Sequence, residues 1–424
     1  MSSFLIEGGN QLSGTLSVSG NKNAALPIIA ASLLTDEKII IHNVPDIIDV
    51  NNMLKIAKNL GVTVSKSGNT LQLQASNITS TKIPKDLSTS IRTSLLFAGP
   101  LLVKCGHAEF WPPGGDVIGR RRLDAHFYGL TTIGAKIISE RTPFILEATQ
   151  LKGKELFFDE ASVTATEHIM MTAVISSGTT IVRNAAAEPH VQDLALFLRS
   201  MGADISGIGT NTLTIVGKRK LHGTEFTISG DHIEAGSFLV MSAITGGELT
   251  INGITPKHYW MLRRIFEKFN ITMEIEGETI FLPGNQNLKI KPDLGNAIPV
   301  ISDGPWPQYP SDMMSCSIVM ATQSQGTVLF FEKMFESRLY FVDKLINMGA
   351  NAVVCDPHRV VITGPAQLVA NEVSSPDIRA GMAMIIAALS ATGKSIIHNS
   401  DIISRGYESI VKKISSIGGN IEKI

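Results

Sequence analysis

The residues that could most clearly take part in catalysis or ligand binding are a lysine, a run of arginines and two carboxylates. They lie in turn-rich segments. Lys22 stands between Asn21 and Asn23, at the start of the apolar stretch ALPIIAASLL. A cation in the first turn of a helix opposes the helix dipole, so this position favours phosphate binding over a structural role. We expect one of the flanking asparagines to cap the helix. The alternative is that Lys22 is an ordinary solvated surface lysine.

A second segment, WPPGGDVIGRRRLDAHFYGL, carries Asp116 and then Arg120, Arg121 and Arg122. Its glycines predict a mobile loop whose backbone can approach a ligand closely. Consecutive arginines suit bidentate binding of an anion. The alternative interpretation of the arginines is a solvated basic patch. The loop therefore combines an acid with a candidate anion site.

Three further arginines stand in loops where the sequence units restart: Arg338 in MFESRLY, Arg379 in SSPDIRAGMA and Arg405 in ISRGYES. A fourth is Arg92 in STSIRTSLL. Each one alone could be a structural ion pair. Arg92 opens a predicted buried helix, where an unpaired charge would be costly. Together these arginines indicate a cleft that neutralises a multiply charged anion.

The carboxylates placed for acid or base chemistry are Asp116 and Asp312, the latter in WPQYPSDMMS. Asp312 could equally cap the helix that follows it. The sequence has no Walker loop, no dinucleotide-binding GxGxxG after a strand and no HExxH motif. Its three cysteines, Cys105, Cys316 and Cys355, are far apart and form no metal-ligand spacing. We therefore expect no metal and no cofactor.

Composition limits the class of protein. The chain has 424 residues, long enough for two ordinary domains, and its 44% hydrophobic content fits a soluble protein with substantial cores. The net charge of −1 provides no global field for nucleic acid. No signal peptide and no membrane-spanning apolar run is recognisable, so we expect a cytoplasmic protein. No obligate protein partner is evident.

A repeated signature organises the chain. A helix-like stretch, a glycine and a short strand recur at Gly61, Gly134, Gly202, Gly349 and Gly418, with a degenerate copy at Asn270. The spacings are 73, 68, 68, 79 and 69 residues. Glycine at such a helix end adopts the left-handed conformation at little cost. The pattern predicts six units of about 70 residues.

Each unit also holds a second helix that is apolar on nearly every face, as in ALPIIAASLL, SLLFAGPLLV and GMAMIIAALS. Such helices are normally buried. We therefore predict two α/β domains of three units each, in preference to an open solenoid. Residues 22–230 form the first and carry the catalytic loop 112–122, while residues 1–21 and 231–424 form the second. The opening strand FLIEGG is expected to complete the sixth unit.

These segments together resemble a known family. SGNKNAA, PGGDVIGRR with LDAH, SVTAT, DHIEAG, YPSDM, FESR, DIRA and SRGYE occur in the order seen in the UDP-N-acetylglucosamine 1-carboxyvinyltransferase type of enolpyruvyl transferase. The resemblance covers essentially the whole chain. It implies an inside-out α/β barrel in each of two domains. It also implies transfer of the enolpyruvyl group of phosphoenolpyruvate (PEP) to the nucleotide sugar, the first committed step of peptidoglycan synthesis.

The resemblance also implies roles for single residues. Asp116 would be the proton donor and Asp312 the base, with Lys22 and Arg405 also in the catalytic set. The implied PEP contacts are Lys22, Asn23, Arg121, Arg338, Arg379 and Arg405. The implied UDP-N-acetylglucosamine contacts are Asn23, Arg92, Arg121, Arg122, Leu123, Asp124, Ala125, Ser162, Val163, Asp312 and Met334.

Two departures from the family pattern leave alternatives open. Most members carry a cysteine where this chain has Asp116, and the usual Arg-Pro-Val-Asp reads Arg121, Arg122, Leu123 and Asp124. Arg122 favours a paralogue that acts on another nucleotide. The related enzyme of shikimate 3-phosphate lacks the loop PGGDVIG. A non-catalytic UDP-sugar-binding regulator would not need the catalytic set, which this chain retains.

The replacement at Asp116 generates a prediction about fosfomycin, an epoxide that, by the resemblance, alkylates the family's loop cysteine. A carboxylate is a far weaker nucleophile than a thiolate, so the natural chain should resist time-dependent inactivation. Asp116→Cys should keep substantial turnover and become alkylated, as intact-protein mass spectrometry would show. Asp116→Asn, similar in size but unable to donate a proton as an acid, should lose most turnover. An active Asn variant would remove Asp116 from the proton-donor role.

Overall fold

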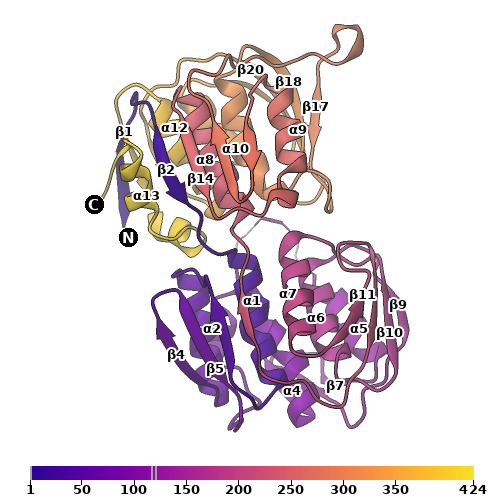
Figure 1. The fold of residues 1–424 in the computed structure, drawn as a ribbon. Coiled ribbons are helices and arrows are strands. Elements are labelled where there is room, and N and C mark those ends of the chain that lie inside the picture. Colours follow the sequence, from indigo (N-terminus) through magenta and orange to yellow (C-terminus); the bar gives the residue numbers. More distant parts are fainter. Residues whose placement is uncertain (1, 116–117, 120–121) are drawn as a thin grey trace. The chain divides into compact units, whose positions relative to one another are not determined.

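The structure is a computed structural model that describes residues 2–115, 118–119 and 122–424. The chain forms two compact units (Figure 1). Among the described residues, the N-terminal unit comprises Gly20–Gly115 and the chain from 122 to Ser229. The C-terminal unit comprises the chain up to Ser19, the pair Ile118 and Gly119, and Gly230–Ile424. The chain therefore passes between the units after Ser19, on either side of the pair Ile118 and Gly119, and after Ser229.

Three sheets of the described residues form the outside of the N-terminal unit. Their strand orders are β13 (Glu225–Thr227), β3 (Ile39–His42), β5 (Thr70–Gln74), β4 (Thr63–Ser67); then β6 (His107–Phe110), β8 (Phe144–Glu147), β7 (Lys136–Ser139); then β11 (Asp204–Ser206), β12 (Thr212–Val216), β10 (Thr179–Arg183), β9 (Glu155–Phe157). Strands β3 and β13 are parallel, as are β9 and β10, and the other pairs are antiparallel.

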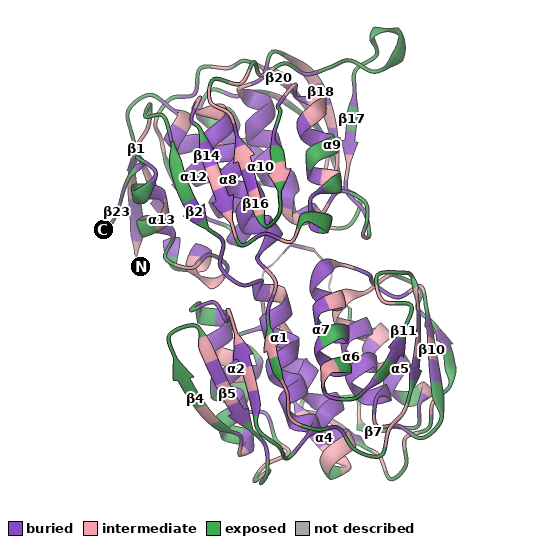
Figure 2. Cartoon of the chain, in the orientation of Figure 1, coloured by how far each residue is buried: buried purple, intermediate pink, exposed green. Residues whose placement is uncertain are grey.

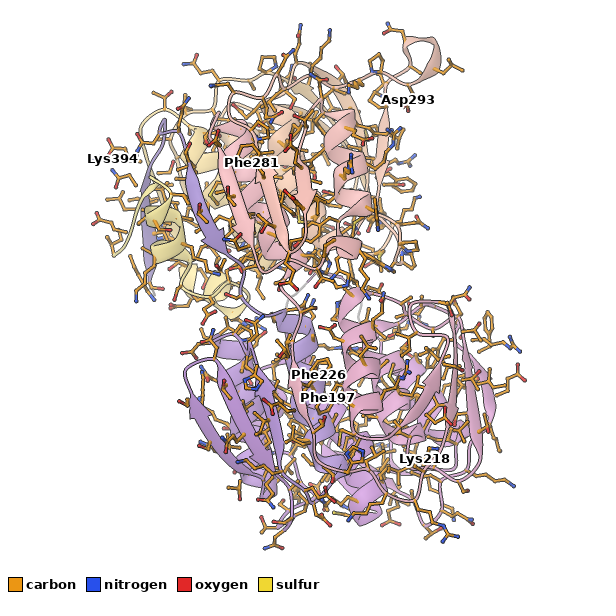
Figure 3. All side chains as sticks on the ribbon, in the orientation of Figure 1. Phe197, Lys218, Phe226, Phe281, Asp293 and Lys394 are labelled. Atoms are coloured by element: carbon orange, nitrogen blue, oxygen red, sulfur yellow. The ribbon has the colours of Figure 1, made fainter. Side chains whose placement is uncertain are left out.

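Helices that are buried on nearly every face fill the N-terminal unit, as Figure 2 shows. They are α1 (Lys22–Ala31), η2 (Arg92–Phe97) running into α4 (Ala98–Cys105), and α6 (Val163–Ala173). Helix α6 contacts both α1 and α4. The remaining helices are η1 (Ser32–Leu34), α2 (Ile48–Leu60), α3 (Lys85–Ser88), α5 (Asp124–Thr132) and α7 (Pro189–Ser200). Phe197 of α7 packs edge-on against Phe226 of β13, with ring centroids 5.6 Å apart (Figure 3).

The C-terminal unit repeats this plan with three further sheets among the described residues. Their orders are β15 (Glu274–Glu276), β16 (Thr279–Leu282), β14 (Leu249–Asn252), β2 (Gly14–Ser17); then β17 (Val300–Ser302), β18 (Gly326–Phe331), β20 (Arg359–Gly364), β19 (Asn351–Asp356); then β21 (Glu372–Ser374), β22 (Lys394–His398), β1 (Ser3–Glu7), β23 (Asn420–Lys423). The fully buried helices α8 (His232–Ile244), α10 (Ser311–Thr322) and α12 (Ile378–Ser390) contact one another. Outside them lie η3 (Pro256–His258), α9 (Trp260–Lys268), η4 (Leu294–Asn296), α11 (Val342–Asn347), η5 (Ser400–Arg405) and α13 (Ile410–Ser416).

The opening strand completes the last sheet, as the sequence predicted. Strand β1 pairs antiparallel with β22 and with β23, so the first and last strands of the chain lie side by side. Phe4 and Ile6 of β1 are buried in the core of the C-terminal unit. The two ends of the chain therefore hold one sheet together.

The signature glycines have the predicted left-handed conformation. Their φ angles are 103°, 112°, 96°, 101° and 95° for Gly61, Gly134, Gly202, Gly349 and Gly418, and Asn270 has a φ of 59°. A β-carbon is strained at such φ values, which glycine avoids and asparagine tolerates better than most residues. Each of these residues ends an amphipathic helix and turns the chain toward a strand.

Candidate active site

Lys22 is buried and paired, so its interpretation as a solvated surface lysine was wrong. Its Nζ lies 2.7 Å from Oδ2 of Asp49, and only 8% of Lys22 is exposed. Asn21 caps α1 by accepting a hydrogen bond from the amide of Ala24 at 3.1 Å. Asp49, in the first turn of α2, was not identified from the sequence. A buried lysine at a helix start can bind a ligand phosphate by electrostatic attraction, which the positive end of the helix dipole favours.

Asp312 lies between two buried guanidinium groups in the C-terminal unit. Its Oδ1 accepts from Arg338 Nη2 at 3.1 Å, and its Oδ2 is 2.7 Å from Arg379 Nη2 and 2.9 Å from Arg379 Nε. The two arginine side chains are 3% and 7% exposed, whereas the Asp312 side chain is 28% exposed. The carboxylate is thus the outermost member of the group. We call Arg338 and Arg379 the arginine pair.

Neighbouring residues fix this geometry. Helix α10 has Pro310 at its N-cap and no side-chain cap, so the prediction that Asp312 might serve as the cap was wrong. Asp377 caps α12 by accepting from the amides of Arg379 and Ala380 at 2.8 and 2.9 Å. Nη1 of Arg379 also donates to the Tyr407 hydroxyl at 3.1 Å. Arg379 is therefore held by a helix cap and by a buried phenol.

A cluster of two buried histidines and the half-buried Trp306 adjoins this site and was not identified from the sequence. The rings of His232, His258 and Trp306 are arranged edge to face, with centroids 5.9 to 6.3 Å apart. Burial is the main cause that lowers the pKa of His232 to about 4, and the charges of Asp312 and Arg379 act in opposite directions on it. His232 is therefore neutral near pH 7. The segment DHIEAG, which contains His232, was one of the segments on which the family resemblance rested. Nothing in the sequence marked this histidine as part of the site.

The N-terminal unit brings several of the predicted nucleotide-sugar contacts together. Arg92 Nη2 donates to the carbonyl oxygen of Arg122 at 2.8 Å. Leu123 is the N-cap residue of α5, which begins at Asp124. Ser162 caps α6 by accepting from the amide of Ala165 at 3.4 Å. Arg92, Leu123 and Ser162 thus each lie at the start of a helix.

A pair of buried histidines joins these helix starts. The amide of Gly99 donates to Nε2 of His168 at 2.7 Å, so Nδ1 of His168 carries the proton that faces Nδ1 of His126 at 3.1 Å. Nε2 of His126 then donates to the Thr164 hydroxyl at 3.1 Å. Burial lowers the pKa of His168 to about 3, which keeps the ring neutral. The chain of bonds thus links α4, α5 and α6.

The other predicted site residues are distributed over both units. Asn23 is half-buried in α1, Val163 begins α6 and Ala125 lies in α5. In the C-terminal unit, Arg405 ends η5 and is half-buried, and Met334 is exposed. Asp116 and Arg121 lie outside the described residues, as does Arg120.

The predicted loop 112–122 is divided between the units. Its first part ends at Gly115 in the N-terminal unit, whereas Ile118 and Gly119 cluster with the C-terminal unit. Ile118 is buried, and its carbonyl oxygen accepts from the amide of Ser337 at 3.3 Å. A buried isoleucine thus attaches these two residues to the segment before Arg338, and the domain bounds given from the sequence stay a prediction.

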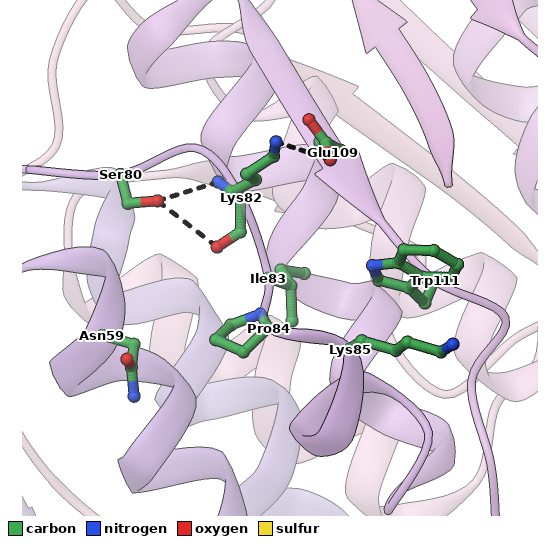
Figure 4. A pocket seen from close by; sticks show the side chains of 8 residues that line it. All are labelled: Asn59, Ser80, Lys82, Ile83, Pro84, Lys85, Glu109 and Trp111. Carbon is green, nitrogen blue, oxygen red and sulfur yellow. Dashed lines mark hydrogen bonds and ion pairs between the residues drawn. The ribbon is translucent and has the colours of Figure 1, made fainter. Parts of the chain in front are cut away.

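A separate pocket of about 390 Å³ lies in the N-terminal unit (Figure 4). Its lining residues are Asn59, Ser80, Lys82, Ile83, Pro84, Lys85, Glu109 and Trp111. Lys85 lies over the Trp111 ring at 4.7 Å, and Lys82 pairs with Glu109 at 3.0 Å. None of these residues is a predicted site residue. Among the described residues, no three His, Cys, Asp or Glu side chains gather as a metal site, and no helix is long and apolar enough to cross a membrane.

Comparison with known proteins assigns the family. A family profile described as EPSP synthase (3-phosphoshikimate 1-carboxyvinyltransferase) matches residues 6–414. The chain is 50% identical over 424 residues to UDP-N-acetylglucosamine 1-carboxyvinyltransferase of Borreliella burgdorferi, covering 100% of this chain and 99% of the relative. It is 52% identical over 423 residues to the protein of that name from Treponema denticola, with 100% and 99% covered.

A solved structure shows the same fold. The enolpyruvyl transferase NikO from Streptomyces tendae superposes with a TM-score of 0.88 at 21% identity, covering 100% of this chain and 99% of that one. The sheets that surround buried helices in each unit are therefore the enolpyruvyl transferase fold. With this fold and with half of its residues identical to full-length relatives, the chain belongs to the UDP-N-acetylglucosamine 1-carboxyvinyltransferase family of enolpyruvyl transferases.

Proposed function

We propose that this chain transfers the enolpyruvyl group of PEP to the 3-hydroxyl of UDP-N-acetylglucosamine and releases phosphate. Full-length relatives that are half identical to the chain carry the name of this activity. The observation of the structure that supports it best is Asp312 between two buried guanidinium groups, because this chemistry needs a base beside a site for a carboxylate. The reaction commits its product to peptidoglycan synthesis. We propose that the protein acts in the cytoplasm.

The proposed residue roles follow from charge. The arginine pair would bind the PEP carboxylate, which resembles the carboxylate of Asp312 that both guanidinium groups contact. Lys22, Arg121 and Arg405 would bind the PEP phosphate. A ligand phosphate would then compete with Asp49 for Lys22, as the PEP carboxylate would compete with Asp312. No cofactor and no metal takes part in these roles.

The nucleotide sugar would be bound mainly by helix starts of the N-terminal unit. The proposed contacts there are Asn23, Arg92, Arg121, Arg122, Leu123, Asp124, Ala125, Ser162 and Val163, and Asp312 and Met334 complete the set. The start of α6 suits an anionic group, because it is the positive end of the helix dipole. The hydrogen bonds through His126 and His168 fix the positions of α5 and α6 relative to each other, which would keep the sugar-binding residues at their starts in place.

The proposed reaction is an addition followed by an elimination. Asp116 gives a proton to the methylene carbon of PEP while the sugar oxygen forms a bond to the second carbon, and Asp312 takes the hydroxyl proton. The resulting tetrahedral ketal then loses a proton from its methyl group as the bond to phosphate breaks. Lysine and arginine side chains stabilise the negative charge of the ketal. The products are inorganic phosphate and the enolpyruvyl nucleotide sugar.

The direct test is an assay with purified protein, PEP and UDP-N-acetylglucosamine. We expect phosphate release that requires both substrates, with a product mass that corresponds to one added enolpyruvyl group. EDTA should leave the rate unchanged, since arginine and lysine carry the neutralising charge. Shikimate 3-phosphate in place of the nucleotide sugar should give no release. Turnover with shikimate 3-phosphate alone would overturn the proposal.

The proposed phosphate ligands generate a second prediction. Lys22→Ala and Arg405→Ala should each lower kcat/KM by about 10² or more, as the loss of a charge-assisted contact of a few kcal/mol would. Lys218→Ala is the matched control, because it removes the same charge from the surface of the N-terminal unit (Figure 3) and should be near neutral. Folding of each variant is checked by circular dichroism. Normal kinetics in both folded alanine variants would mean that the phosphate binds elsewhere.

A further inference from the structure

Two carboxyl side chains face each other in the core of the C-terminal unit. Asp303 directly follows β17, and Glu332 directly follows β18. These strands are parallel, and their register pairs Ser302 with Phe331, so the next residue of each strand lies beside the other. Both side chains are fully buried. Two ionised carboxylates in such a place would repel each other strongly.

The hydrogen bonds show which oxygen lacks a proton donor. Glu332 Oε2 accepts from the Ser311 hydroxyl at 2.8 Å, and its Oε1 accepts from the amides of Met334 and Phe335 at 3.1 Å. Asp303 Oδ1 accepts from the amide of Lys333 at 2.6 Å. Asp303 Oδ2 is buried and has no donor in the described structure. A proton on the carboxyl group of Glu332 would provide one.

Electrostatics agree with this geometry. Burial, followed by the hydrogen bond and the charge of Asp303, raises the pKa of Glu332 to about 8, against the opposing effects of Arg338 and Ser311. The other charged or titratable side chains that pack here are Lys333, whose Nζ bonds the Ser302 hydroxyl at 3.0 Å, and His358, whose Nδ1 lies 2.7 Å from the main-chain oxygen of Glu332. Within the described part of the chain, each of these two side chains thus bonds a group other than the two carboxyls.

We propose that Asp303 and Glu332 share one proton, and that this carboxyl pair positions the substrate-binding residues on either side of it. One side is Ser311, which precedes Asp312. The other side is the turn from Lys333 to Phe335, which presents Met334 and leads to Arg338. The guanidinium group of Arg338 also stacks on the Phe335 ring at 5.1 Å. The positions of Asp312, Arg338 and Met334 thus depend on the proton that Asp303 and Glu332 share.

The sign of the pH dependence follows from the shifted pKa. The pKa of Glu332 in the folded chain lies above its unfolded value of 4.5, so folding retains a proton that the unfolded chain releases. The stabilisation is complete below the unfolded value and is lost as the pH rises through about 8. Above that pH the two carboxylates repel each other, and the turn at 333–335 loses its anchor.

The test compares two variants that replace one carboxyl group by an amide of the same size. In Asp303→Asn the amide can donate to an ionised Glu332, and in Glu332→Gln it can donate to an ionised Asp303, so neither needs the shared proton. We expect the Tm of the unmodified chain to fall as the pH rises from about 4.5 to about 8 and to level off above that pH, and this fall to be smaller in both variants. Glu278→Gln is the control for lost charge, because Glu278 is exposed in the same unit. It should retain the fall of the unmodified chain.

The positioning role rests on the proposed function and is tested separately through kinetics. The KM for UDP-N-acetylglucosamine should rise several-fold above about pH 8 in the unmodified chain and stay flat in Asp303→Asn and Glu332→Gln. Equal thermal profiles in all four proteins would overturn the shared proton. Flattened thermal profiles with an unchanged KM profile would overturn the positioning role. A chain that never turns over the nucleotide sugar, yet shows the thermal difference, would contradict the proposed function and leave the shared proton established.

Discussion

The contact between Asp312 and the arginine pair is the interaction on which the rest of the candidate site depends. Two guanidinium groups, both almost fully buried, would be very costly without an anion beside them. Asp312 supplies that anion from the first turn of α10, while Arg379 comes from the first turn of α12 and Arg338 from the segment after β18. Under the proposed function, a substrate carboxylate would take over part of this role, and the released Asp312 would then accept a proton. The same contact would thus stabilise the fold and determine when the proposed base can act.

The fold places such groups at the starts of its buried helices. Helices α1, α6, α8, α10 and α12 are almost entirely buried, and each has a polar or charged residue at its start, in or next to the first turn, as at Lys22, Ser162, His232, Asp312 and Arg379. Those ends are also the positive ends of the helix dipoles, which suits a protein that binds phosphate and carboxylate groups.

Sequence reasoning identified the residues that local chemistry marks, and missed the partners that only tertiary contacts create. The glycine signature, the buried helices and the pairing of the first strand with the last sheet followed from patterns within short segments. Asp49, the partner of Lys22, lies 27 positions away along the chain and has no motif of its own. Asp303 and Glu332 meet only through the register of two strands. Asp312 was identified as either a base or a helix cap, and the structure decides against the cap because its carboxylate binds the arginine pair.

The central claim, that Asp312 is a base which the arginine pair holds until a substrate carboxylate binds, is tested most directly with Asp312→Asn in single-turnover kinetics. The amide keeps the size of the side chain but cannot compete as an anion for the guanidinium groups. The account predicts a rate of ketal formation lower by about 10² to 10⁴, the range of general base catalysis, with a Kd for PEP that is unchanged or lower. A normal rate combined with a weakened affinity for PEP would contradict it, because Asp312 would then bind substrate and take no part in proton transfer.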